Sequence, residues 1–109
     1  MADRLANGLL LFMTDIDPKN EDDFNRWYEE EHLAERLAIP GFITARRFQA
    51  VEVRPKYLAI YDLESPDVLQ SAPYLHVVGA GKSSWTKRVE TLFVNGRRNT
   101  YVGISERRR

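Results

Sequence analysis

The chain has 109 residues, of which 43% are hydrophobic and 11% aromatic, enough for one folded domain with a single core. Its 16 Lys and Arg balance 16 Asp and Glu, so a zero formal net charge gives no general attraction to nucleic acid or a membrane surface. The absence of cysteine excludes disulfide scaffolds, thiolate metal sites and cysteine nucleophiles. No apolar run approaches the roughly 20 residues of a membrane span and no signal peptide is evident, so a cytoplasmic protein is expected.

The first predicted elements are a strand and a helix. Residues 8–13 form a short apolar run typical of a buried strand, after a loose arm at residues 1–7. A helix is expected after Asn20, because the acidic residues 21–23 suit its positive N-terminal end. Along this helix an apolar stripe runs through residues 24, 27 and 28.

The apolar pattern of this helix changes after Tyr28. Continuing the stripe requires apolar residues near positions 31 and 35, where the chain has Glu31 and Glu35. The next aliphatic residues fall on nearly the opposite side of a straight helix. The helix therefore either kinks or ends near His32, or it is buried on two sides. We predict a break there, followed by a second short helix over 33–38.

The second half of the chain has further strand and helix signals. It predicts strands over 42–51, 56–63 and 87–94, the first two forming a hairpin, and a short helix over 65–71. Asn95-Gly96 is a typical turn dipeptide, and residues 105–109 form a basic tail.

The order strand, helix, strand, strand, helix, strand defines the fold class. It is that of an α+β, ferredoxin-like β-α-β-β-α-β sandwich, here a single domain over residues 1–109 with a four-stranded antiparallel sheet. Helices on one face leave the other face of the sheet bare, and a bare apolar face needs a cover. A second copy provides it, so we predict a homodimer that forms a dimeric α/β barrel.

Two motifs carry a family resemblance. Residues 23–32, DFNRWYEEEH, and the IPGF segment at 39–42 resemble the EthD-like branch of the dimeric α/β-barrel superfamily. In that branch a Phe-x-x-Trp-Tyr-x-x-Glu-His helix leads into a Val/Ile-Pro-Gly-Phe segment. The resemblance covers about residues 8–102, although Ala34 stands where many relatives have proline. It implies a ligand pocket between each sheet and its helices, and relatives that include cofactor-independent lyases, cyclases, isomerases and small monooxygenases.

Three residues are candidates for catalysis: His32, Glu31 and Tyr28. Histidine has an ordinary pKa of about 6.5, so it can both accept and donate a proton, and the motif histidine lines the pocket in several relatives. A structural role at the helix end is the alternative for His32. Glu31 falls on the stripe expected to be buried, so it either borders a polar cavity or has a partner such as Arg46 or Arg47. Glu31 and His32 lack a third metal ligand at suitable spacing, so no metal is expected.

Aromatic residues and a second histidine are candidates for substrate binding. A tyrosine hydroxyl on the second hairpin strand could stabilise an oxyanion, while tryptophan and phenylalanine rings would exclude water. For each of them an ordinary place in the core or a loop is the alternative. The candidates are Phe24, Trp27, Tyr57, Tyr61, His76 and Trp85.

Arginines near the end of the chain offer a further possibility for substrate binding. Arg88 or Arg97 could clamp a substrate carboxylate. Arg97 and Arg98 are adjacent on an extended segment, so at most one of them faces any pocket.

These residues predict a cofactor-independent enzyme of small-molecule metabolism. His32 would transfer a proton on a small apolar carbonyl or aromatic compound, in a lyase, isomerase or cyclase reaction. One alternative is a cofactorless monooxygenase of the small dimeric-barrel kind, which consumes oxygen. Another is a non-catalytic hydrophobic-ligand binder or accessory protein. No cofactor is expected, and the expected partners are a second copy and a small-molecule substrate rather than nucleic acid or a membrane.

Overall fold

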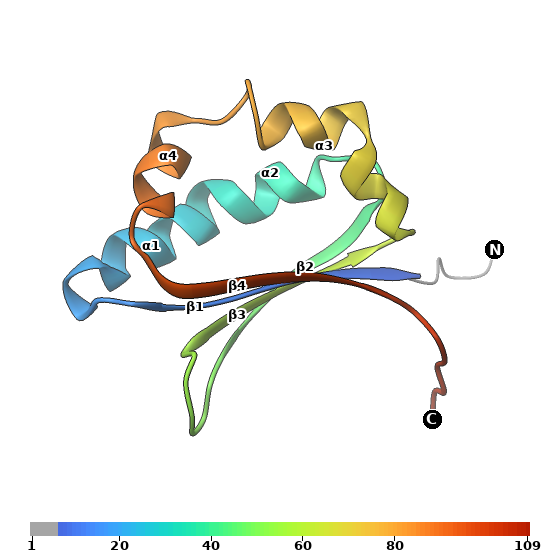
Figure 1. Ribbon diagram of the computed structural model, residues 1–109, viewed down its shortest axis with the longest axis horizontal. Helices are drawn as coiled ribbons and strands as arrows, with labels where there is room; N and C mark the ends of the chain where they lie inside the picture. The colour runs from blue at the N-terminus through green and yellow to red at the C-terminus, as the bar shows by residue number, and fades with distance from the viewer. Residues whose placement is uncertain (1–6) are drawn as a thin grey trace.

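The chain follows the predicted order of a strand, helical segments, two strands, helical segments and a strand (Figure 1). The computed structural model describes residues 7–109. The strands are β1 (Gly8–Ile16), β2 (Phe42–Gln49), β3 (Tyr57–Leu63) and β4 (Phe93–Val102). The helical segments are η1 (Pro18–Asn20), α1 (Glu21–Trp27), η2 (Tyr28–His32), α2 (Leu33–Leu37), η3 (Pro66–Gln70), α3 (Ala72–Val77) and α4 (Ser84–Glu90).

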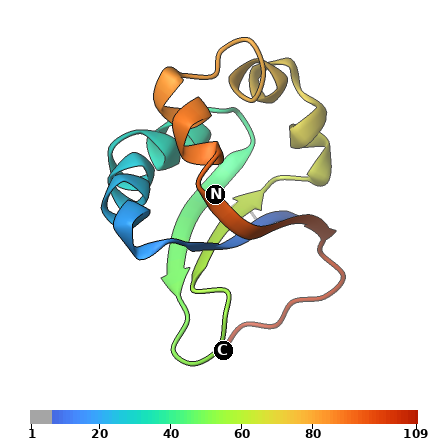
Figure 2. The same cartoon turned by 60° about the vertical axis from the view of Figure 1, so that its left-hand side comes forward.

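The four strands form one antiparallel sheet in the order β2-β3-β1-β4. In Figures 1 and 2 all the helices lie on the same side of this sheet. The ferredoxin-like α+β fold class is therefore confirmed, with β1 and β3 in the centre and β2 and β4 at the edges.

The core lies between the sheet and the helices. Leu10 of β1 pairs with Tyr61 of β3, and Ala59 pairs with Phe12; the side chains of this alternating set point toward the helices. Phe24 and Trp27 of α1 pack onto them and are almost completely buried.

The opposite sheet face has an apolar centre on β1 and β3, and no element within residues 7–109 covers it (Figure 1). Polar side chains alternate onto the same face, mostly from the edge strands: Thr44, Arg46, Asp62, Arg97 and Asn99. Leu11 and Ile60 pair on this face and are only half-buried. The large apolar side chains that alternate onto it are Leu9, Leu11, Met13, Phe48, Leu58, Ile60 and Tyr101.

Two strands differ from their predicted extent. β1 continues to Ile16 because its last residues pair with the start of β4, so the apolar run underestimates its length. In β2 a register shift after Phe42 turns that side chain toward the helices, together with Ala45, whereas simple alternation placed it with Thr44.

The predicted strand over 87–94 is wrong. Ser83 accepts a hydrogen bond from the Thr86 N–H and starts α4, which buries Thr86 and Val89 at helical spacing. The predicted turn at Asn95-Gly96 is also wrong, because both residues lie inside β4. Asn95 has a φ of 53°, and the pairing of β1 with β4 shifts register opposite it, which is the geometry of a bulge rather than a hairpin.

The predicted helix at 65–71 forms as a short 3-10 helix. Ser65 caps it by accepting from the Asp67 N–H, as the Ser-Pro pattern indicates. Ser71 then caps α3, in whose first turn Pro73 lies, where proline is tolerated.

The ends of the chain are described in part. Of the expected loose arm at 1–7, all but Asn7 lies outside the described residues; the Asn7 N–H donates to the Leu63 carbonyl at 3.0 Å. The tail at 105–109 is exposed and has no helix or strand. Within residues 7–109, no helix has the length and apolar character needed to cross a membrane.

Candidate functional site

The long helix that follows β1 contains a turn with one extra residue. α1, η2 and α2 follow each other without a break, and η2 is a π-helix whose closing bond runs from the Leu33 N–H to the Tyr28 carbonyl. A π-turn of this kind shifts every later side chain by one position around the helix. The buried stripe therefore continues through His32 and Arg36 instead of positions 31 and 35, and the predicted break near His32 is wrong.

A cavity of about 410 Å³ lies between this helix and the sheet. Its volume is in the range of small-molecule binding sites. The wall is mostly apolar and aromatic, with a few polar and charged side chains. It is lined by Leu10, Phe12, Trp27, Tyr28, His32, Arg36, Tyr61, Tyr74, Val78, Glu90, Phe93 and Arg98.

His32 is the buried imidazole of this cavity, with 6% of its surface exposed. Its ring stacks on Trp27, the two ring centres being 4.1 Å apart, and meets the Tyr28 ring edge-on. Neither ring nitrogen has a hydrogen-bond partner among residues 7–109: Nδ1 is completely buried, whereas Nε2 remains accessible from the cavity. Burial, reinforced by the positive charges of Arg36 and Arg47, holds the pKa of His32 well below 6.5. The imidazole is therefore neutral at physiological pH.

Tyr28 and Tyr61 place two phenol groups on the same cavity. Burial raises the pKa of Tyr28 to about 12. Burial likewise raises the pKa of Tyr61 well above 10. Both hydroxyls are therefore protonated at neutral pH and can act as hydrogen-bond donors beside His32.

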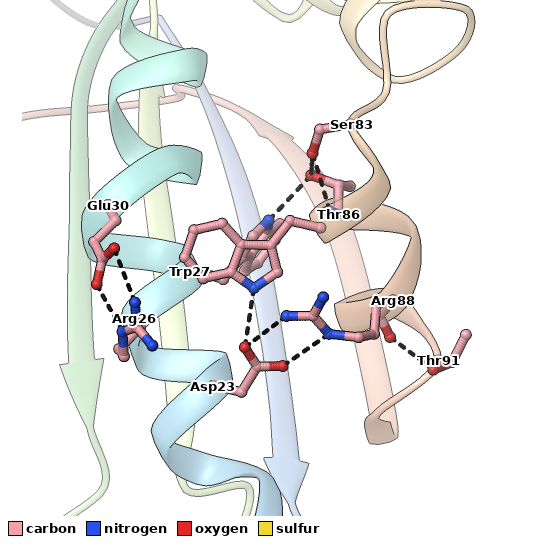
Figure 3. Close-up of polar contacts among 9 residues, drawn as sticks. Asp23, Arg26, Trp27, Glu30, Ser83, Thr86, Arg88 and Thr91 are labelled. Atoms are coloured by element: carbon pink, nitrogen blue, oxygen red, sulfur yellow. Dashed lines mark hydrogen bonds and ion pairs between the residues drawn. The ribbon is translucent and has the colours of Figure 1, made fainter.

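Glu31 does not line the cavity, because the π-turn rotates it toward α4. Its Oε2 accepts hydrogen bonds from the hydroxyls of Ser83 at 2.7 Å and Thr86 at 3.2 Å, and Thr86 in turn accepts from the Trp27 indole at 3.0 Å. Figure 3 shows Trp27 and Thr86 facing each other between α1 and α4. These bonds join the helix to the start of α4, so Glu31 has partners other than the arginines considered from the sequence. Residues 7–109 contain no cluster of three side chains placed to bind a metal ion.

The remaining predicted binding residues lie elsewhere. Phe24 is completely buried in the core, and the Tyr57 hydroxyl donates to Glu21 at 2.7 Å. The Trp85 indole donates to Asp23 at 3.0 Å, outside the cavity, and His76 is exposed on α3. Of the predicted site residues, the structure thus brings four to the cavity: Trp27, Tyr28, His32 and Tyr61.

The charged lining was not anticipated from the sequence. Arg88, one of the two arginines considered there, is held by Asp23 through two bonds of 2.8 and 3.1 Å (Figure 3). Arg97 and Arg98 are adjacent on β4, so their side chains point to opposite faces of the sheet. Arg98 is the one that lines the cavity. Arg36 follows His32 by four residues, and this spacing was the one available signal for it.

Comparison with known proteins gives matches among solved structures alone. No protein-family model matches the chain, and no curated protein does. A dimeric ferredoxin-like protein from an uncultured marine organism has a TM-score of 0.75 and 17% identity, over 97% of this chain and 95% of that one. A putative antibiotic biosynthesis monooxygenase from Nitrosomonas europaea has a TM-score of 0.64 and 11% identity, over 95% and 96%. SnoaB, a cofactor-independent oxygenase from Streptomyces nogalater, has a TM-score of 0.66 and 11% identity, over 94% and 97%.

At these identities the similarity establishes the fold alone. The chain shares the ferredoxin-like fold of these proteins over nearly its whole length. The resemblance is thus confirmed at the level of the ferredoxin-like class, while the EthD-like branch is not confirmed and stays a prediction.

Proposed function

We propose that this protein is a cofactor-independent oxygenase of small-molecule metabolism, in which His32 removes a proton from a weakly acidic carbon of a small aromatic or carbonyl compound. The observation that carries the proposal is the neutral imidazole of His32, buried and without a hydrogen-bond partner, on the wall of a mostly apolar cavity. The oxygenase reaction is preferred to a lyase or isomerase reaction because two structures of the same fold bear the names monooxygenase and oxygenase.

The first step is proton transfer to Nε2 of His32. The electron pair of the broken carbon–hydrogen bond moves into the adjacent carbonyl or ring and gives an enolate or phenolate. The hydroxyls of Tyr28 and Tyr61 are protonated donors at the same wall, so they stabilise the developing oxyanion.

Burial makes His32 a weak base on its own, and the substrate anion compensates for this. Protonation of a lone buried imidazole is unfavourable. In the reaction the imidazolium forms next to the enolate, and two opposite charges attract strongly where water is excluded. The cavity therefore favours proton transfer from substrate over protonation from solvent.

The second step uses molecular oxygen as the co-substrate. The electron-rich anion transfers its electrons to oxygen and forms a carbon–oxygen bond. For an activated methylene group, both carbon–hydrogen bonds break, one oxygen atom becomes a new carbonyl, and the other leaves as water with the two hydrogens. The substrate supplies all the electrons, so no external reductant is consumed.

The test is oxygen uptake with a panel of small aromatic compounds that carry a methylene group next to a carbonyl. We expect His32→Gln to lower the rate of turnover by about 100-fold or more while the fold is retained. His76→Gln is the matched control, because His76 is exposed and outside the cavity. An unchanged rate in His32→Gln would overturn the role of His32. Turnover without oxygen uptake would identify a lyase or isomerase, and ligand binding without turnover would identify a binding protein.

We further propose that two copies pair through the uncovered sheet face. The face presents half-buried apolar side chains on the two central strands, such as Leu11, Leu58 and Ile60. A large apolar face of this kind marks an interaction surface, and a two-fold pair buries the same face of both copies. The marine structure with the same fold is described as dimeric, which supports this arrangement.

A further inference from the structure

Among residues 7–109, Arg36 is the one arginine that is buried, with 9% of its surface exposed. Its one hydrogen bond runs from Nη1 to Glu35 at 3.4 Å, and its guanidinium lies 5.8 Å from the centre of the Tyr74 ring. Nε and Nη2 have no partner in the described chain. They are not enclosed, because the single completely buried polar side-chain atom without a partner is Nδ1 of His32. Because Arg36 lines the cavity, a molecule bound there lies beside its guanidinium.

Arg47 shows how this fold satisfies an arginine that has a structural role. Its guanidinium donates to Glu29 at 2.9 Å and to Asn25 at 2.6 Å, and it lies 4.3 Å from the centre of the Tyr28 ring. By contrast, the single contact of Arg36 is long. Burying a cation with incomplete pairing is unfavourable, so the placement of Arg36 calls for a further partner.

The other charges on the cavity also favour an anion. Arg98 of β4 donates to the Tyr74 hydroxyl at 3.1 Å, so Tyr74 contacts both cavity arginines. The one acidic side chain on the lining, Glu90, is already paired with Lys82 at 2.8 Å. The lining thus carries two cations and one neutralised carboxylate.

We propose that the substrate of this cavity carries a carboxylate that pairs with Arg36, while its aromatic or carbonyl part lies against Trp27 and Phe93. A guanidinium presents two parallel N–H donors that match the two oxygens of a carboxylate. Arg36 and His32 are four residues apart on one helix, so the carboxylate and the carbon that loses a proton lie about one helical turn apart. This inference rests on the proposed function for the claim that the cavity holds a substrate, and it adds the substrate's chemical class.

The test compares charged and neutral probes of the same shape. Calorimetric titration of the full chain with 2-naphthoate and with 2-naphthamide measures the preference for a carboxylate, and benzoate with benzamide gives a smaller pair. Of 2-naphthoate and benzoate, we take the acid that the wild-type protein binds more tightly. We expect its affinity to be at least about tenfold higher than that of the matching amide. Arg36→Gln should bring this ratio to about one, and Arg36→Lys should retain part of it. Arg26→Gln is the control, because Arg26 is exposed and paired with Glu30 on the helix surface.

A readout on the wild-type protein keeps the proposal testable should Arg36→Gln fail to fold. Naphthoate, but not naphthamide, should shift the Nε–H resonance of Arg36. Equal affinities for acid and amide, a preference that persists in Arg36→Gln, or no binding of either acid at millimolar concentration would each overturn the proposal. These are binding measurements without turnover, so their failure is distinct from an unchanged oxygen uptake in His32→Gln.

Discussion

His32 gives the protein a specific dependence of stability on pH. In the folded chain the pKa of His32 is lowered, mainly by burial, whereas in the unfolded chain it returns to about 6.5. Below pH ~6.5 the unfolded chain therefore binds a proton that the folded chain does not. The stability contribution is complete above that pH and is lost as the pH falls toward the folded-state pKa, by up to about 1.4 kcal/mol per pH unit.

We therefore expect His32→Gln to have a flatter dependence of unfolding free energy on pH between ~7.5 and ~5 than the wild-type protein. Urea unfolding at a series of pH values measures this slope. His76→Gln should keep the wild-type slope, because His76 is exposed. If His32→Gln and the wild-type protein show the same slope, His32 is not held neutral by burial.

Three of the predicted site residues that line the cavity share one property. Trp27, Tyr28 and Tyr61 are large aromatic residues on regular helix or strand faces, where the spacing alone determines which side is buried. Arg36 was not predicted, because an arginine in a helix is usually solvated and its burial depends on the surrounding fold. Glu31 was assigned to the buried stripe because no sequence pattern marks a π-turn.

At the scale of elements, one buried group of hydrogen bonds holds the helix that carries Trp27 and His32 against α4. The hydroxyl of Thr86 accepts from the Trp27 indole and donates to Glu31, and Thr86 is 3% exposed. Thr86→Val keeps the shape but leaves the Trp27 donor without an acceptor. We expect this to lower the free energy of unfolding by about 1–3 kcal/mol, measured by urea unfolding.

Thr91→Val is the matched control for that substitution. The Thr91 hydroxyl donates to the Arg88 carbonyl at 2.7 Å on the surface just after α4 (Figure 3), so its loss should change stability by less than about 0.5 kcal/mol. Equal effects of the two substitutions would show that the buried contact does not stabilise the packing of the helix against α4.

Sequence reasoning predicted a strand over residues 87–94, where the second half of α4 lies. Residues 87–94 contain branched and aromatic side chains that suit a strand. Ser83 as an N-cap and the spacing of Thr86 and Val89 indicate a helix, and packing against α1 decides between them. Short segments of this kind carry too few periods to separate the two patterns.

The whole molecule has one sheet face that a second copy is proposed to cover. We expect sedimentation to give twice the chain mass of 12.7 kDa. Ile60→Lys, which places a charge in the middle of that face, should give a monomer at micromolar concentration. Val51→Lys is the control, because Val51 is 97% exposed in the loop between β2 and β3. A wild-type monomer, or a dimer that survives Ile60→Lys, would contradict this arrangement.

The order of elements, and with it the fold, was accessible from the sequence because most strands and helices have a recognisable apolar pattern between turn signals. The interior of the cavity was not. The lining depends on which side chains of β4 and of the helical segments meet across the cavity. Packing of these elements in three dimensions determines that, and the sequence pattern does not show it.

The π-turn at Tyr28–His32 has a consequence for how such a cavity arises. Each residue of an α-helix turns the chain by about 100° around the helix axis. Deleting a single residue from this turn would therefore rotate His32 and Arg36 away from the cavity, although no other residue changes. The side chains of His32 and Arg36 face the cavity because the π-turn rotates the helix, and not because of which residues follow it. A protein of this fold without the π-turn would therefore have the same residues in the same order, but its cavity would lack the imidazole and the guanidinium.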